Sequence, residues 1–368
     1  MPLSPWTDER LAALQLMSTG CFAARTLFRL KQSCADIKTI IHTPAEKLPL
    51  NDPQRVLFRE TIRTNIQPIL KTIESQQIQF LLPEDPGFPQ ALREMEDPPF
   101  GLFLRGAPLG DRIRVAIVGT RDITPYGRRV TTFLSRELTR HGISIVSGLA
   151  FGVDLAAHEA CIEAGGHTIA VLPGGVNTAS VMPPSHAPIA QRFVKNQTGT
   201  LLSEYPPSAP IKAFHFLLRN RLIAAIASAI IVTEGDHKSG ALVTARLGLE
   251  GGRDVLAVPG DIFSPTSRGT NALIADGARP CRNAEDVLSV LGLKNTEQAK
   301  QIAEARREIP VTPDEARLLS ALSFPQSVDD LSRLLQESVA KTSATISILE
   351  LKGCVLAVGP RTYVRNTG

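Results

Sequence analysis

The chain has 368 residues, which is too long for one ordinary domain and predicts two or three. Its hydrophobic content of 43% and charged content of 21% are typical of a soluble globular protein, and no apolar run is long and charge-free enough to span a bilayer. The net charge of +4 permits a polyanionic partner without arguing for one, and MPLSPWTDERLAALQ shows no secretory signal. The five scattered cysteines form neither a C-x-x-C pair nor a zinc-spaced cluster, so we expect free thiols, no metal and a cytoplasmic location.

The elements expected along the chain change in character near residue 76. Residues 7–75 carry apolar residues at three- and four-residue spacing and predict a small helical bundle. A short strand, IQFLL, and a proline-rich segment follow, and from Arg112 near-continuous apolar strands alternate with helices. The strands are expected at 114–119, 143–148, 167–175, 200–207, 229–235 and 254–260. This alternation predicts an α/β fold with a parallel sheet covered on both faces.

The last part of the chain begins with a polar stretch, KNTEQAKQIAEARREIPVTP, which is typical of a linker. Three short helices and a hairpin-like VLAVGPRTYV follow, which is the outline of a winged helix. Its third helix has Lys341 near the start and otherwise Ser, Thr and apolar residues, which favours a protein contact or weak DNA contact over sequence-specific reading. We therefore expect a helical domain of the SAM or helix-hairpin-helix kind at 1–76, a parallel-sheet domain at 77–292, a linker at 293–310 and a winged-helix domain at 311–368.

The carboxyl ends of the predicted strands carry the unusual residues, and ligands of open parallel sheets bind beyond these ends. Glycines and small hydroxyl residues there expose backbone N–H groups and open helices, which suits phosphate. The candidates are Gly119, Thr120 and Arg121 after the first strand, Ser147, Gly148 and Gly152 after the second, and Lys238, Ser239 and Gly240 after the fifth. Neither G-x-x-x-x-G-K-[ST] nor G-x-G-x-x-G is present at the expected place, so a Walker or standard dinucleotide site is not predicted.

Arg219, Asn220 and Arg221 stand together between the apolar segments 214–218 and 222–232. If a helix begins near Arg219, both arginines emerge at the carboxyl edge of the sheet and contact phosphate, while Asn220 fixes the loop or touches a base. The alternative is that one arginine forms an internal ion pair with Glu204 or Glu234. The sequence leaves both explanations open.

The segments of the central domain, taken in the order in which they occur along the chain, resemble those of the DNA-processing protein A family, which is also called DprA or Smf. The resemblance covers about residues 77–290 and rests on VAIVGTR, IVSGLAFGVDLAAHEA, LLSEYPP, FLLRNRLIAAIAS, SGALVTARLGLEGGRDVLAVPG and GTNALIADGA. It implies an extended Rossmann-like domain that binds and protects single-stranded DNA without base preference. It also implies a homodimer formed through that domain and loading of the RecA recombinase in natural transformation and recombination.

The resemblance also assigns roles to single residues. It implies phosphate contacts by Arg121, Arg219, Arg221 and Lys238, a base covered by Phe216, and a basic Lys212 near the mouth of the pocket. Pro183 and Pro184 stand where the family usually has Tyr-Pro, and Leu217 follows Phe216 where proline is common, so contacts from these segments are not carried over.

An enzyme is the alternative to a binding protein. Residues 173–178 resemble the P-G-G-x-G-T motif of nucleotide phosphoribohydrolases of the lysine-decarboxylase-like group. Asn177 replaces the second glycine of that motif and Val181 its catalytic glutamate, so acid–base help for glycosidic cleavage is missing. The sequence therefore favours a binding protein with neither catalytic residues nor a cofactor.

Overall fold

The structure is a computed structural model that describes residues 6–293, 311–322, 324–352 and 354–365. The chain divides into two compact units, Met1–Gly292 and Leu293–Gly368. Residues 294–310 of the predicted linker lie outside the described residues. Within the described residues, no helix combines the length and the apolar character needed to cross a membrane.

The N-terminal part is helical, as predicted. Its helices are α1 (Asp8–Met17), α2 (Ala24–Ser33), α3 (Ile37–His42), α4 (Asp52–Arg63) and α5 (Gln67–Ser75). Side-chain caps begin several of them: the Thr7 hydroxyl accepts from the backbone N–H of Arg10, and Asn51 and Gln54 form a capping box.

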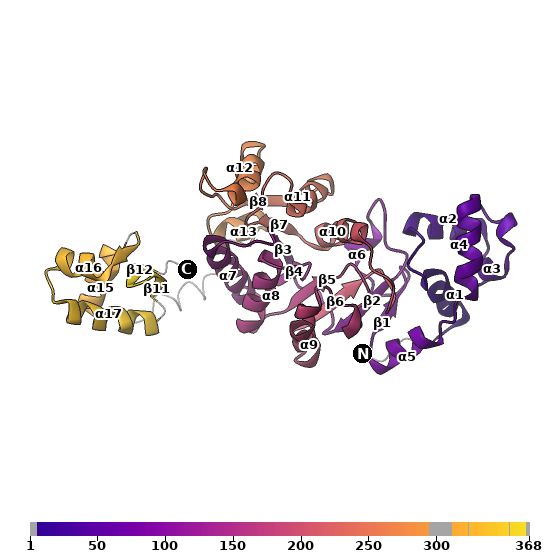
Figure 1. Ribbon diagram of the computed structural model, residues 1–368, viewed down its shortest axis with the longest axis horizontal. Helices are drawn as coiled ribbons and strands as arrows, with labels where there is room; N and C mark the ends of the chain where they lie inside the picture. Colours follow the sequence, from indigo (N-terminus) through magenta and orange to yellow (C-terminus); the bar gives the residue numbers. More distant parts are fainter. Residues whose placement is uncertain (1–5, 294–310, 323, 353, 366–368) are drawn as a thin grey trace. The chain divides into compact units, whose positions relative to one another are not determined.

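The apolar faces of these helices belong to a cluster that also contains residues of the large sheet. Leu14, Leu30 and Phe58 are fully buried in the same cluster as Phe80 and Phe103. Figure 1 shows these helices beside β1 and β2. This shared core crosses the predicted boundary at residue 76, and the boundary itself stays a prediction.

A nine-stranded sheet forms the centre of the first unit. Its strands are β1 (Gln79–Leu81), β2 (Leu102–Gly106), β3 (Arg114–Val118), β4 (Ser144–Ser147), β5 (Thr168–Val171), β6 (Gly199–Ser203), β7 (Ala229–Val232), β8 (Asp254–Ala257) and β9 (Arg279–Pro280). They lie in the order β1-β2-β6-β5-β4-β3-β7-β8-β9, and all pairs from β6 to β9 are parallel.

This sheet confirms the predicted α/β fold and extends it. The six predicted strands each begin within one residue of the prediction, but they end earlier because the turn residues at their carboxyl ends, glycines in five of the six, belong to the loops. β2, which was not predicted, pairs antiparallel with β1 and β6 and adds an antiparallel edge to the parallel sheet.

Helices cover both faces of the sheet. They are α6 (Gln90–Arg93), α7 (Pro125–Arg140), α8 (Val153–Glu163), α9 (Ala187–Lys195), α10 (Ala213–Ile226), α11 (Gly240–Glu250), α12 (Arg268–Ala275) and α13 (Ala284–Val290). On one face Leu222 and Ile226 of α10 pack with Val118 of β3, and on the other Phe193 of α9 packs with Ala170 of β5. The apolar strands are therefore buried on both sides, which explains their continuous hydrophobic runs.

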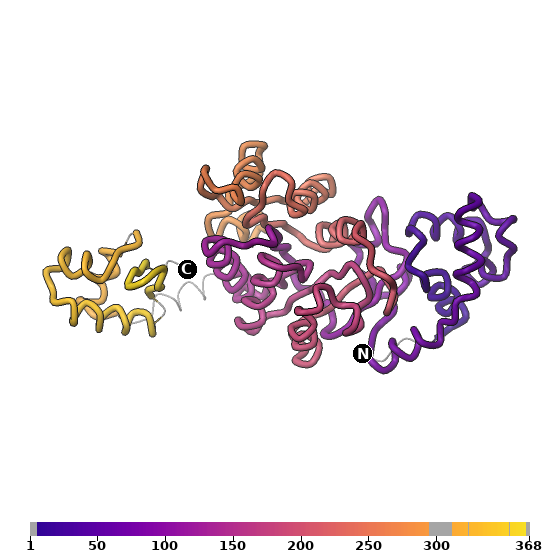
Figure 2. The backbone as a smooth tube through the Cα atoms, in the orientation of Figure 1, coloured from indigo at the N-terminus to yellow at the C-terminus, as the bar shows by residue number. Residues whose placement is uncertain are grey.

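The direction of winding changes at β3, whose neighbours in the sheet are β4 and β7. The chain forms β4 to β6 on one side of β3 and then β7 to β9 on the other side, and Figure 2 traces its path in the orientation of Figure 1. In open α/β sheets such a switch point leaves a crevice at the carboxyl ends of the strands, where ligands bind.

The start of α10 corrects one sequence prediction. The helix begins at Ala213, not near Arg219, because the apolar residues before the arginines form its first two turns. Arg219, Asn220 and Arg221 consequently lie in the middle of the helix. Residues two positions apart on a helix point in nearly opposite directions, so Arg219 and Arg221 cannot both face one site.

The second unit has the predicted winged-helix outline. Its helices are α15 (Pro313–Ala321), α16 (Val328–Leu335) and α17 (Val339–Leu351), and its strands β10 (Gln326–Ser327), β11 (Val355–Gly359) and β12 (Thr362–Arg365) lie in the order β10-β12-β11. Leu318, Leu331, Ile346 and Leu349 form its core. The hairpin of β11 and β12 is the wing.

Candidate nucleic-acid interface

A pocket of about 410 Å³ opens at the switch point of the sheet. Its walls come from the residues after β3, the turn after β4, one face of α10, and the loop between β7 and α11. Nine of the fourteen sequence-predicted residues line it: Gly119, Thr120, Arg121, Phe216, Arg219, Asn220, Lys238, Ser239 and Gly240. The fold thus brings together strand ends that are far apart in the sequence, and their contacts with a ligand stay a prediction.

One face of α10 forms a wall of this pocket. Phe216, Arg219, Asn220 and Ile223 line it, and their spacing of three, four and seven residues places them on one side of the helix. The Asn220 amide donates to the carbonyl of Gly240 over 3.4 Å, which ties α10 to the start of α11. Asn220 therefore holds the loop before α11, which is one of the two roles predicted for it.

Two cations at this pocket are exposed and form no ion pair within the described residues: Arg121 and Lys238. The guanidinium carbon of Arg121 lies 5.7 Å from the centroid of the Phe216 ring. This cation–π contact positions Arg121 without neutralising its charge. Both cations can therefore contact an incoming anion.

Arg219 is different, because it lies in the pocket wall and is only 5% exposed. Its guanidinium donates to the carbonyl of Val171, and its Nε has no hydrogen-bond partner within the described part of the chain. Gly148 makes room for it, since a Cβ at that position would collide with the guanidinium. The pKa of Arg219 is lowered to about 10, chiefly by burial; the charge of Asp154 acts to raise it and that of Arg121 to lower it. A cation in this setting gains from an anionic ligand.

Asp154, which the sequence analysis did not single out, also lines the pocket. Its carboxylate accepts from the backbone N–H groups of Gly148 (3.0 Å) and Ala150 (3.3 Å), so it holds the turn after β4. Burial raises its pKa, while Arg219 and these N–H groups lower it. An acidic residue in the first turn of a helix, directly behind a glycine turn, was the signal that could have identified it.

Arg221 points away from the pocket and confirms the internal alternative for one of the two arginines. It forms an ion pair with Glu204 and donates to the carbonyl of Asp97 over 2.7 Å. The side chains of Arg221 and Glu204 are only 13% and 11% exposed. Arg221 therefore links α10 to the end of β6 and to the segment before β2.

Glu234 was the other carboxylate considered as an arginine partner, and it has a different role. It accepts from the backbone N–H (3.0 Å) and the hydroxyl of Thr124, and from the hydroxyl of Thr266 (3.2 Å). Since Thr124 caps α7, Glu234 fixes the start of that helix and the loop before α12. Neither Arg219 nor Arg221 forms an ion pair with it among the described residues.

Three further predicted residues, Ser147, Gly152 and Lys212, lie outside the lining of the pocket. The Ser147 hydroxyl donates to the carbonyl of Ile117 over 2.7 Å and is buried. Gly152 has a φ of +76°, and a Cβ there would collide with the carbonyl of Thr120, so glycine is required at this close approach. Lys212 precedes α10, is exposed, and lies with its Nζ 5.9 Å from the ring centroid of Phe214.

The formal charges of the pocket lining are balanced. Asp122, Asp154 and Asp236 accompany the three basic residues. Asp154 is engaged by backbone donors, and Asp236 accepts from the backbone N–H of His237 over 2.8 Å. The pocket is therefore suited to an anion through the positions of its donors and not through a large excess of positive charge.

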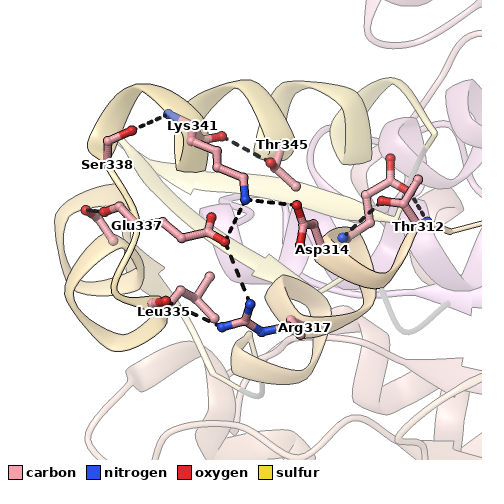
Figure 3. Close-up of polar contacts among 10 residues, drawn as sticks. Thr312, Asp314, Arg317, Leu335, Glu337, Ser338, Lys341 and Thr345 are labelled. Carbon is pink, nitrogen blue, oxygen red and sulfur yellow. Dashed lines mark hydrogen bonds and ion pairs between the residues drawn. The ribbon is translucent and has the colours of Figure 1, made fainter.

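The third helix of the winged domain, α17, is the second surface to consider, because this helix enters the major groove in many winged helices. Lys341 forms ion pairs with Asp314 (2.9 Å) and Glu337 (3.0 Å), as Figure 3 shows. Arg317 reaches the same Glu337 at 4.0 Å. The one lysine predicted for this helix start is thus held by carboxylates.

The described residues contain no group of three His, Cys, Asp or Glu side chains that could hold a metal ion. In the segment that resembles the phosphoribohydrolase motif, Val181 is buried and the amide oxygen of Asn177 accepts from the backbone N–H of Ser208 over 3.2 Å. That segment is held by structural contacts.

Comparison with known proteins gives consistent matches over nearly the whole chain. The family model of DNA recombination-mediator protein A matches residues 79–292, and that of the DprA winged helix domain matches residues 302–359. Protein Smf of Escherichia coli is 34% identical over 371 residues, which covers 96% of this chain and 94% of that protein.

Two solved structures are also similar. DNA processing protein A from Streptococcus pneumoniae matches with a TM-score of 0.65 and 28% identity, covering 77% of this chain and 98% of that one. DNA processing protein A from Helicobacter pylori, described for its single-stranded DNA binding mode, matches with a TM-score of 0.52 and 33% identity, covering 58% of this chain and 95% of that one.

Proposed function

The chain belongs to the DNA recombination-mediator protein A family, and from this premise we propose that it binds single-stranded DNA in the pocket at the switch point of its large sheet. The observation that carries the proposal is the arrangement of two exposed cations, Arg121 and Lys238, which form no ion pair with any described residue, around a partly exposed phenyl ring, Phe216. Cations and aromatic rings in one groove are the two components of single-strand binding.

Each part of the pocket has a task in this proposal. Arg121 and Lys238 contact phosphates, and the N-terminus of α11, which begins at Gly240 in the lining, adds a favourable dipole. Phe216 and the planar guanidinium above it offer a surface for a base. Buried Arg219 contributes positive charge from the wall. Asn220 is engaged with Gly240, so few groups remain to read base edges, and we expect weak sequence preference.

The wider role follows the family. We propose that the protein protects single strands and helps to load the RecA recombinase on them during natural transformation and recombination. We further propose that it acts in the cytoplasm as a homodimer formed through the Rossmann-like domain, and that it acts by binding and not by catalysis. The H. pylori relative's single-stranded DNA binding supports the first step of this scheme.

A titration with fluorescent single strands, duplexes and free nucleotides tests the proposal. Single strands should bind more tightly than duplexes, and no nucleotide should be hydrolysed. If Arg121 and Lys238 each neutralise one phosphate, log K should fall with log salt at a slope of about −1.4, since each contact with a single strand contributes about −0.7. A salt-independent affinity, or equal affinity for duplex DNA, would contradict the proposal.

A further inference from the structure

The first two turns of α10 carry exposed apolar side chains, and of these the pocket lining includes only Leu217; Phe216, which also lines the pocket, is not one of them. Phe214, Leu217 and Leu218 are 52%, 54% and 45% exposed. Their spacing of three and four residues places them on one side of the helix, and we call them the α10 ridge. A contiguous group of large exposed apolar side chains usually marks a binding surface.

The ridge is continuous with the pocket. Leu217 belongs to both, because it also lines the pocket. Phe214 lies one turn closer to the start of α10, and neighbours at this spacing have Cβ atoms about 5–6 Å apart. A strand that leaves the pocket past Leu217 therefore meets Phe214 next.

Phe214 is held in place from behind. The edge of its ring packs on His215, with ring centroids 4.6 Å apart and planes at 84°. His215 is buried and stacks on Tyr205 with centroids 4.2 Å apart and planes at 12°. The phenyl ring is thus supported on the protein side while half of its surface stays exposed.

The ridge also has a cation beside its ring. Lys212 Nζ lies 5.9 Å from the centroid of Phe214, and this lysine forms no ion pair with any described residue. The pocket contains the same combination, with the Arg121 guanidinium 5.7 Å from the centroid of Phe216. A second cation–ring pair therefore lies outside the pocket, on a side of α10 different from that of Phe216.

We propose that single-stranded DNA continues from the pocket over the α10 ridge, with a base on Phe214 and the adjacent phosphate at Lys212. This inference rests on the proposed function. An apolar protein partner would also cover the ridge, but it would not need a cation next to an aromatic face. A nucleotide needs both, because it joins an anionic phosphate to a base that stacks on rings.

The dependence of affinity on strand length tests this path. A strand of about four nucleotides fills the pocket only, whereas one of about sixteen also reaches the ridge. We expect Phe214→Ala to weaken binding of the longer strand by at least about fivefold, the equivalent of about 1 kcal/mol, and to leave the shorter strand unaffected. Phe214→Tyr should keep the wild-type affinity, and Phe214→Leu should lose it as Ala does. Phe324→Ala, which removes an exposed phenylalanine from the second unit, is the matched control.

A tryptophan at the ridge reports stacking directly. Fluorescence of Phe214→Trp should be quenched by the longer strand much more than by the shorter one. The unaltered protein, whose only tryptophan is Trp6, corrects for the background signal.

The outcomes separate this inference from the proposed function. If the wild type binds no single strand, both fail together. If Arg121→Ala weakens both strand lengths while Phe214→Ala weakens neither and no quenching occurs, the proposed function stands and the ridge path is wrong. If Phe214→Leu binds as well as Phe214→Tyr, the ridge makes an apolar contact and the stacking proposal is overturned.

Discussion

Ligands of open α/β sheets bind at the carboxyl edge, and the third helix of a winged helix often enters the DNA major groove, but the cations of these two regions differ in availability here. At the sheet edge, Arg121 and Lys238 form no ion pair within the described residues. On α17, Lys341 is shared between Asp314 and Glu337. Binding phosphate at α17 would require these ion pairs to break, whereas the sheet edge can contact phosphate as it stands.

The difference shows that the number of basic residues is a poor guide to where a polyanion binds. The net charge of only +4 does not locate a binding surface, whereas the place of Arg121 and Lys238 in the pocket, exposed and without an ion pair among the described residues, does. A similar contrast occurs on α10, where Arg221 is paired with Glu204 while Arg219, although buried, lines the pocket. Four changes test this distinction between paired and available charges.

Arg221→Ala should have the largest effect, and it should affect stability. It leaves Glu204 unpaired in a site where both side chains are nearly buried, which typically costs about 3–5 kcal/mol. Denaturant unfolding measures this loss, and single-strand affinity per folded molecule should not change. A matched double variant, Arg221→Met with Glu204→Gln, should recover part of the stability because no buried charge remains. A variant Arg221→Ala that is stable but binds weakly would place Arg221 among the DNA-contacting residues.

Acid should destabilise the first unit before the second. Burial lowers the pKa of His158 to about 3 and of His167 to about 4, from an ordinary value of 6.5. Below pH 6.5 these histidines are therefore protonated in the unfolded state but stay neutral in the folded state. The free energy of unfolding consequently falls as the pH falls. Two such histidines should cost about 3 kcal/mol between pH 7.5 and 5.5.

The second unit contains no histidine, because the last histidine of the chain is His237. Its stability therefore lacks this dependence on pH. Hydrogen bonds from Lys341 and Lys352 lower the pKa values of Asp314 and Glu315, so their stabilising contribution is lost only when the pH falls below their ordinary values of 3.8 and 4.5. Denaturant unfolding followed by Trp6 fluorescence reports the first unit, and circular dichroism reports both. A Trp6 transition that stays constant from pH 7.5 to 5.5 would contradict this prediction.

Arg121→Ala should weaken single-strand binding and leave stability within about 0.5 kcal/mol of the wild type. A charge-assisted hydrogen bond to phosphate contributes about 1.5–3 kcal/mol, so affinity should fall about tenfold to a hundredfold. The salt slope should also become shallower by about 0.7. The control is Arg128→Ala, which removes a different exposed arginine, one that lies in α7. If both variants lost the same affinity, DNA binding would depend on the overall positive potential of the surface and not on the pocket.

Lys341→Ala should have the smallest effect. Lys341 and Asp314 are each 50% exposed, and exposed ion pairs contribute less than about 1 kcal/mol. Single-strand affinity should stay unchanged. A loss of affinity as large as that of Arg121→Ala would show that α17 takes part in binding despite its ion pairs, and the contrast between the two regions would fail.

The sequence determined the elements whose signals are local. Apolar runs bounded by glycine placed six strands to within one residue at their starts, and helical periodicity identified the N-terminal helices and the winged domain. Since parallel strands align their carboxyl ends, the residues that follow β3 and β7 could be assigned to one edge before their contacts were known. Six of the nine predicted residues that line the pocket follow these two strands and meet for this reason.

Only the tertiary structure decided which way single side chains point and which charges are paired. The directions of Arg219 and Arg221 depend on α10, a helix whose start at Ala213 sets where the arginines lie along it. The partner of Arg221, Glu204, lies at the end of another strand, and the carboxylate of Asp154 reaches back to the turn that precedes its helix. A helix turns each residue by 100° from the last, and ion pairs form between groups distant in sequence, so neither property can be deduced from composition or local spacing.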